Sequence, residues 1–237
     1  MRIVQVVACW FGWRRAADPR QGPDPLLYLR YWGEALRHLR HDLITETVFV
    51  FSGPVAFGAP ELVAEMPGAR WIARPNQGLS YGAYSDAYAG AVTGPVDRWV
   101  LCEDDYVPAV DDYDAIMSSL LDAAGPRCGF SCAKLGPTVD GRPHASVFIG
   151  MLPDAALRAA ANARGGRLPV PEGGEYNHAE ISGQIGWSLL LQDCGWSLSE
   201  WHPGREVVFW EDKVTVFPGA APALFVPVQT IRKDPPR

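Results

Sequence analysis

The chain has 237 residues, of which 48% are hydrophobic and 11% aromatic, so it can bury a sizeable core, and disorder is excluded as its main state. Lys and Arg number 21 against 27 Asp and Glu, and the formal net charge of −6 disfavours binding of nucleic acid through bulk positive charge. No run approaches the roughly 18 consecutive apolar residues that a membrane-spanning helix needs.

The first half of the chain alternates strand and helix patterns. Residues 3–8 form a continuous apolar run, which predicts a buried strand rather than a signal peptide, because no small-residue cleavage site follows. Apolar side chains at spacings of three and four over residues 29–39 predict a helix, opened by an Asp-Pro pair. The other predicted elements are strands at 47–51, 70–74 and 98–102, a short helix at 60–66, and a helix at roughly 80–92.

This alternation predicts the α/β class, with a mostly parallel central sheet and helices on both faces. The second half is less regular: it shows strands at 145–151 and 206–210, a helix at 181–192, and a loop rich in Gly and Pro at 162–178. No linker divides the chain, so a single domain over residues 1–237 is expected. Ligands of parallel sheets bind outside the carboxyl ends of the strands, so functional residues are expected just after positions 8, 51, 74 and 102.

Three consecutive acids, Glu103, Asp104 and Asp105, follow the fourth predicted strand. They would repel one another unless a positive group lies among them, and a divalent cation is the simplest partner because hard cations bind carboxylate oxygens. Asp105 is the expected direct ligand, and Glu103 is expected to hold a ribose hydroxyl or a metal-bound water. The alternative is a solvated acidic turn that also caps a following helix near Asp111 and Asp112. The segment alone leaves both interpretations open.

The residues upstream of these acids carry a resemblance to a known family. Residues 76–91 read NQGLSYGAYSDAYAGA, so an Asn-x-Gly turn after a strand is followed by a helix start of small residues and then by a strand that ends in acids. This order resembles the GT-A glycosyltransferases that use nucleotide sugars, particularly their large family 2. The string EDDYVPAVDDYDAI is similar to the EDD region of N-acetylglucosaminyltransferase I, which shares that fold. The resemblance implies a GT-A fold in which residues 1–110 bind the nucleotide sugar and residues 111–237 the acceptor.

The same resemblance implies roles for particular residues. Asp105 would bind Mn²⁺ or Mg²⁺, which neutralises the diphosphate of the donor, and Glu103 and Asp104 would lie on the sugar, the ribose or a metal-bound water. Glu103 is counted among the metal ligands for that reason. His202, in the late segment SEWHPG, is a further candidate ligand, because GT-A enzymes often recruit a late histidine; the alternative is an ordinary surface residue.

The general base of an inverting transfer is expected in the second half of the chain. The segment 175–196 resembles the family 2 stretch in which an acid opens a helix that ends at a Gly-aromatic pair, and Glu180 occupies the position of that acid. Glu175 and His178 are close substitutes. The alternative for Glu180 is a favourable position at a helix N-terminus without a catalytic role.

Six further residues, which follow the first and third strands, are expected around the nucleotide: Ala8, Cys9, Trp10, Arg74, Asn76 and Gly78. Backbone contacts and stacking are expected at the end of the first strand, although Trp10 is equally compatible with the core. After the third strand, Arg74 is expected to meet a phosphate, and Gly78 would permit close backbone approach.

The expected function is therefore metal-dependent transfer of a sugar from a nucleotide diphosphate sugar to an acceptor hydroxyl, with inversion. A saccharide or other glycan is the preferred acceptor, and a modified DNA base ranks below it because of the net acidity. Two alternatives stay open: nucleotidyl transfer on a related fold, and a non-catalytic nucleotide-sugar-binding module. The five scattered cysteines contain no C-x-x-C pair, which predicts reduced core residues in a cytoplasmic protein.

Overall fold

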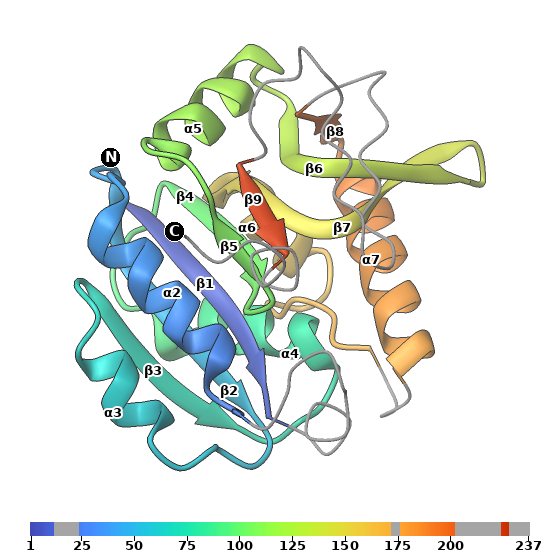
Figure 1. The fold of residues 1–237 in the computed structure, drawn as a ribbon. Helices are drawn as coiled ribbons and strands as arrows, with labels where there is room; N and C mark the ends of the chain where they lie inside the picture. The colour runs from blue at the N-terminus through green and yellow to red at the C-terminus, as the bar shows by residue number, and fades with distance from the viewer. Residues whose placement is uncertain (12–23, 172–175, 202–223, 228–237) are drawn as a thin grey trace.

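The computed structural model describes residues 1–11, 24–171, 176–201 and 224–227 (Figure 1). In this part of the chain, the main sheet has seven strands in the order β3-β2-β1-β4-β7-β6-β8. Their bounds are β1 Ile3–Trp10, β2 Ile44–Ser52, β3 Ala69–Arg74, β4 Arg98–Glu103, β6 Cys128–Val139, β7 Arg142–Pro153 and β8 Ser197–Glu200. A small second sheet pairs β5 (Tyr106–Pro108) with β9 (Phe225–Pro227).

The strand directions make the main sheet mostly parallel. β1 pairs in parallel with both β2 and β4, and β2 pairs in parallel with β3. β7 is antiparallel to its neighbours β4 and β6, and β8 is parallel to β6. The carboxyl ends of β1 to β4 therefore lie together at one edge of the sheet, which is where parallel sheets place their ligands.

Helices cover both faces of this sheet. They are α2 (Leu27–His38), α3 (Ala59–Ala64), α4 (Leu79–Asp86), α5 (Tyr113–Ala123), α6 (Asp154–Asn162) and α7 (Tyr176–Asp193), with a π-helical turn η1 at Ala87–Ala91. α2, α3 and α5 pack in one buried cluster, and α4, α6 and α7 pack in another on the opposite face (Figure 1). The predicted α/β class, with a mostly parallel sheet and helices on both faces, is confirmed.

The central strand shows why this architecture forms. Alternate side chains of β1 enter the two clusters, Val7 on one face and Val6 on the other, and both are completely buried. Strands with two apolar faces need a helical layer on each side, because each face must leave water. On the α2 face, the Trp32 ring meets the Phe49 ring edge-on at a centroid distance of 5.8 Å.

The second half differs from the sequence expectation. The predicted strand at 145–151 is the central part of β7, but the loop predicted over residues 162–178 is shorter, because α7 begins at Tyr176. α6 was not predicted, since its alanine-rich sequence has few large apolar residues to mark a buried face. The predicted strand at 206–210 lies outside the described residues.

The cysteines are mostly core residues, as expected. None of the five, all of which lie in the described ranges, forms a disulfide, and four are buried while Cys194 is partly exposed. None of the helices in the described part of the chain combines the length and the apolar character that crossing a membrane requires.

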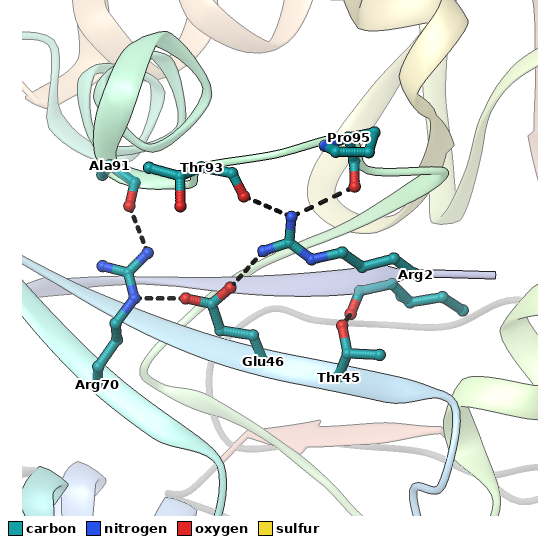
Figure 2. A network of polar contacts seen from close by, with 8 residues as sticks. Arg2, Thr45, Glu46, Arg70, Ala91, Thr93 and Pro95 are labelled. Carbon is teal, nitrogen blue, oxygen red and sulfur yellow. Dashed lines mark hydrogen bonds and ion pairs between the residues drawn. The ribbon is translucent and has the colours of Figure 1, made fainter.

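An ion-pair network ties the strands together at the amino-terminal edge of the sheet (Figure 2). Glu46 of β2 lies between two arginines: its Oε2 is 2.8 Å from Nη2 of Arg2, and its Oε1 accepts a hydrogen bond from Nε of Arg70. Arg2 also donates to the carbonyl of Thr93 at 2.6 Å, and Arg70 donates to the carbonyl of Ala91. Glu46 thus connects β2 and β3 with the residue that precedes β1, and its two arginines reach the segment before β4, at the edge opposite the carboxyl ends.

The Glu46→Ala substitution is expected to lower the free energy of unfolding by about 1–2 kcal/mol, because it leaves two neighbouring guanidinium groups without their shared carboxylate. Urea unfolding measures the loss. Glu65→Ala is the matched control, since Glu65 is exposed just beyond α3 and its removal is expected to change the stability by less than about 0.5 kcal/mol. Equal effects of the two substitutions would contradict a stabilising role for the network.

Candidate functional site

The carboxyl ends of four strands lie side by side at one edge of the sheet. Trp10 at the end of β1 is in register with Ser52 of β2, and Ser52 is in register with Arg74 of β3. On the other side of β1, Ala8 is in register with Glu103, the last residue of β4. The segments that the sequence placed after the first and fourth strands are therefore neighbours in the sheet.

The three acids at the end of β4 have limited exposure, and the backbone of Asp104 is held by two hydrogen bonds. Asp104 is 1% exposed, and Glu103 and Asp105 are half-buried. The Asp104 backbone N–H donates to the carbonyl of Ala8 at 3.0 Å, and the Asp104 carbonyl accepts from Nε1 of Trp32 at 3.0 Å. These carboxylates are partly withdrawn from water, which costs free energy unless their charges are compensated.

The alternative interpretation of the acids included a cap on the next helix, and this capping does not match the geometry. β5 separates the acids from α5, which begins at Tyr113. The residue before α5, Asp112, makes no side-chain capping bond and pairs instead with Arg40 at 2.7 Å. Neither the three acids nor Asp112 caps the helix.

The negative charges of the acids raise the pKa values of neighbouring side chains. Burial raises the pKa of the Cys102 thiol well above its usual value, and the charges of Glu103, Asp104 and Asp105 raise it further. Burial also raises the pKa of the Tyr84 hydroxyl on α4, with added contributions that include the charges of Glu103 and Asp105. The negative charge is thus concentrated where β4 ends beside α4.

The Asn-x-Gly-x-Ser turn meets these acids directly. Ser80 of α4 donates a hydrogen bond from its Oγ to Oε1 of Glu103 at 2.6 Å. The two segments that carried the family resemblance therefore touch in the structure. Ser80 was not singled out from the sequence, although it is the serine of the quoted pattern, and that pattern was the signal that pointed to it.

Gly78 was expected to lie close to a nucleotide, and in the structure it lies close to Val170. It precedes α4 with a φ of +67°, and a Cβ added there would lie 2.3 Å from Cγ1 of Val170. The close approach that this glycine permits is therefore made by the chain itself. Its predicted contact with a nucleotide stays a prediction.

Arg74 acts as a brace in this structure. Its guanidinium contacts Oδ2 of Asp86 at 2.5 Å, Oγ of Ser52 at 3.2 Å and the carbonyl of Gln77 at 2.9 Å. Its side chain is only 7% exposed. These contacts use three of the five guanidinium N–H groups and hold the loop between β3 and α4 in place. The predicted phosphate contact of Arg74 stays a prediction.

The remaining loop residue, Asn76, lies against the turn after β2. A Cβ added to Gly53 would be 3.4 Å from Cβ of Asn76. The Asn76 Oδ1 atom is buried and has no hydrogen-bond partner within the described ranges. Its predicted role near the nucleotide remains a prediction.

At the end of β1, some of the residues predicted to contact the nucleotide are buried in the core and others are partly exposed. Ala8 is 6% exposed and Cys9 is 1% exposed, and they point into opposite clusters of the core. The side chains of these two residues serve packing, and the Ala8 carbonyl accepts from the Asp104 N–H. Their predicted backbone contacts with a nucleotide stay predictions. Trp10 is half-buried, and Phe11 beyond it meets Phe51 at a centroid distance of 5.2 Å. Both aromatic residues retain an accessible surface.

The structure describes only the backbone of the predicted base Glu180. Glu180 is the fifth residue of α7, and its side chain lies outside the described set. Glu175 and His202 lie entirely outside the described residues. α7 begins at Tyr176, so Glu180 lies one position beyond its first turn, which contains no acid. α7 itself contacts α4: a Cβ added to Gly183 would lie 2.1 Å from the Tyr81 ring.

The donor chemistry of the acids fits a hard divalent cation. Within the described ranges, no group of three or more His, Cys, Asp and Glu side chains is arranged to hold a metal ion. Mg²⁺ and similar cations are commonly bound by one or two carboxylates together with substrate phosphates and water. Glu103 and Asp105 match that pattern, and the occupancy of the site by Mn²⁺ or Mg²⁺ is a prediction.

Comparison with known proteins gives similarity at the level of the fold. No profile of a protein family matches the sequence, and no curated protein matches it. Among solved structures, 4-diphosphocytidyl-2C-methyl-D-erythritol synthase is 13% identical with a TM-score of 0.47, over 84% of this chain and 87% of that one. A protein described as a nucleotide-diphospho-sugar transferase from Desulfovibrio desulfuricans is 14% identical with a TM-score of 0.48, over 84% and 78%. The galactosyltransferase LgtC, solved with donor and acceptor sugar analogs, is 10% identical with a TM-score of 0.42, over 77% and 70%. Similarity at this level assigns no activity to the chain.

Proposed function

We propose that the protein transfers a sugar from a nucleotide diphosphate sugar to an acceptor hydroxyl, with Mn²⁺ or Mg²⁺ held by Asp105 and Glu103. The observation that carries the proposal is the run of three acids that ends β4 at the carboxyl edge of the sheet, one buried and two half-buried. Neighbouring carboxylates in a partly desolvated place repel one another, and a bound divalent cation offsets both the repulsion and the lost hydration.

The residues around these acids have distinct tasks in this proposal. When bound, the cation supplies positive charge that stabilises the diphosphate as a leaving group. Asp105 and Glu103 hold the cation, and the Asp104 backbone, anchored to Ala8 and Trp32, keeps their positions constant. Trp10 offers a surface on which a nucleobase stacks.

The acceptor hydroxyl loses its proton to a base in an inverting transfer, and Glu180 on α7 is the candidate. The packing of α7 on α4 at Gly183 supports this assignment, because it brings the helix that contains Glu180 against the helix whose Ser80 contacts the acids. His202 is a further candidate for the metal. A glycan is the preferred acceptor, and a modified DNA base ranks below it because of the formal net charge of −6.

The test is a donor screen with the full chain. Calorimetric titration with uridine, guanosine, thymidine and cytidine diphosphates in Mn²⁺ identifies the base, and release of the nucleoside diphosphate from the matching nucleotide sugars is then assayed with oligosaccharide acceptors. Mn²⁺-dependent release that EDTA abolishes is the expected result. Pyrophosphate release from a nucleoside triphosphate and a sugar phosphate would assign nucleotidyl transfer instead. Binding without turnover would assign a binding module, and no binding at all would overturn the proposal.

A further inference from the structure

We infer that Ser80 is a positioning residue that fixes the carboxylate of Glu103 toward the metal and donor site, an inference that rests on the proposed function. The contact joins α4 to the end of β4 across 23 residues of sequence, with Oγ of Ser80 2.6 Å from Oε1 of Glu103. An O–H to carboxylate bond of this length is in the range of charge-assisted hydrogen bonds, which are stronger than neutral ones.

Hydrogen-bond chemistry determines the direction of this contact. A serine hydroxyl has a single proton, and an ionised carboxylate can only accept, so Ser80 must donate to Glu103. Holding one carboxylate oxygen at a set position also sets the orientation of the other. Glu103 has several rotatable bonds, and without this contact its carboxylate would sample more orientations at the site.

The backbone before Ser80 is strained, which supports a positional role. Gly78 and Leu79 are consecutive residues in the left-handed region, with φ of +67° and +49°. A bulky residue such as Leu79 is an outlier there, and such strain persists only where the surroundings over-determine it. Strained positions of this kind cluster at functional sites.

The surroundings of this turn do over-determine it. Arg74 binds the carbonyl of Gln77 before the turn and Asp86 at the end of α4, so one buried guanidinium holds both sides of the Ser80 segment. Val170 packs over Gly78 from the other direction. The start of α4 is thus held in a position in which the Ser80 hydroxyl meets Glu103, at the energetic cost of the strained Leu79.

The test compares the Ser80→Ala, Ser80→Thr and Ser85→Ala variants of the full chain. Ser85 is the matched control, because it lies on the same helix and donates to the carbonyl of Leu168 at 3.2 Å instead of to a carboxylate. Binding of Mn²⁺ alone is followed by loss of the electron paramagnetic resonance signal of the free ion, and the unfolding temperature is recorded in parallel.

Ser80→Ala is expected to weaken Mn²⁺ binding by about tenfold, as is common when a partner of a metal ligand is removed. Ser80→Thr keeps the hydroxyl and should stay within about twofold of the unmodified chain, and Ser85→Ala should bind Mn²⁺ normally whatever its unfolding temperature. If Ser80→Ala binds Mn²⁺ as well as the unmodified chain while only its unfolding temperature falls, Ser80 is merely structural and the inference is overturned. If the unmodified chain itself fails to bind Mn²⁺, the metal site of the proposed function falls, and the inference falls with it.

Discussion

Replacing Asp105 with Asn is expected to lower the catalytic efficiency of nucleoside diphosphate release by at least about 100-fold, because the substitution removes the charge of the proposed cation ligand while it keeps the shape of the side chain. The measurement is kcat/KM for the donor at saturating Mn²⁺. Loss of a ligand should also raise the Mn²⁺ concentration needed for half-maximal rate.

The stability of the Asp105→Asn variant provides a second and independent readout. Removing one of three adjacent negative charges relieves repulsion, so the variant without metal should be as stable as the unmodified chain or more stable. Asp122→Asn is the matched control, because Asp122 pairs with Arg98 at 2.6 Å at the amino-terminal end of β4. That variant should keep full activity. An Asp105→Asn variant with full activity would show that the acids do not bind a catalytic cation.

Gly183→Ala is expected to destabilise the protein by about 3 kcal/mol, at the upper end of the usual cost of overpacking a core. The added Cβ would lie 2.1 Å from Cδ2 of Tyr81, a distance that real contacts do not reach. Tyr81 cannot move away easily, because its ring is 2% exposed and packs edge-on against Tyr84 and Trp187, with centroid distances of 6.1 and 5.6 Å. α7 would have to shift away from α4.

The control for this prediction lies on the same helix. A Cβ added to Gly186 meets nothing within 4 Å, so Gly186→Ala should stabilise the protein by up to about 1 kcal/mol through helix propensity. Urea unfolding measures both variants. Equal stabilities would mean that α4 and α7 do not pack as closely as described. Because α7 contains Glu180, a shift of the helix should also lower the transfer rate.

Several residues that the sequence assigned to the nucleotide also have a structural role in the fold. Arg74 at the end of a strand predicts a phosphate ligand, and in the structure its contacts with Asp86, Ser52 and Gln77 also hold a loop. Ala8 ends the apolar run and Cys9 follows it, and both side chains are buried in the core, so only their backbone is left for the predicted nucleotide contact. A residue at the correct end of a strand is available to a ligand only if the rest of the fold does not occupy it.

The local pattern of apolar residues in the sequence was sufficient to predict the parallel half of the sheet. β1 and most of β2 and β4 are apolar segments with two buried faces, and strand and helix patterns alternate along the chain, so the α/β class and the edge that contains the acids could be predicted. The serine that binds Glu103 is 23 positions away in sequence, and the glycine of α7 that accommodates Tyr81 is about 100 positions away. Such contacts depend on how complete helices pack across the sheet. The spacing of residues along the chain does not encode this packing, so only the tertiary structure decided these contacts.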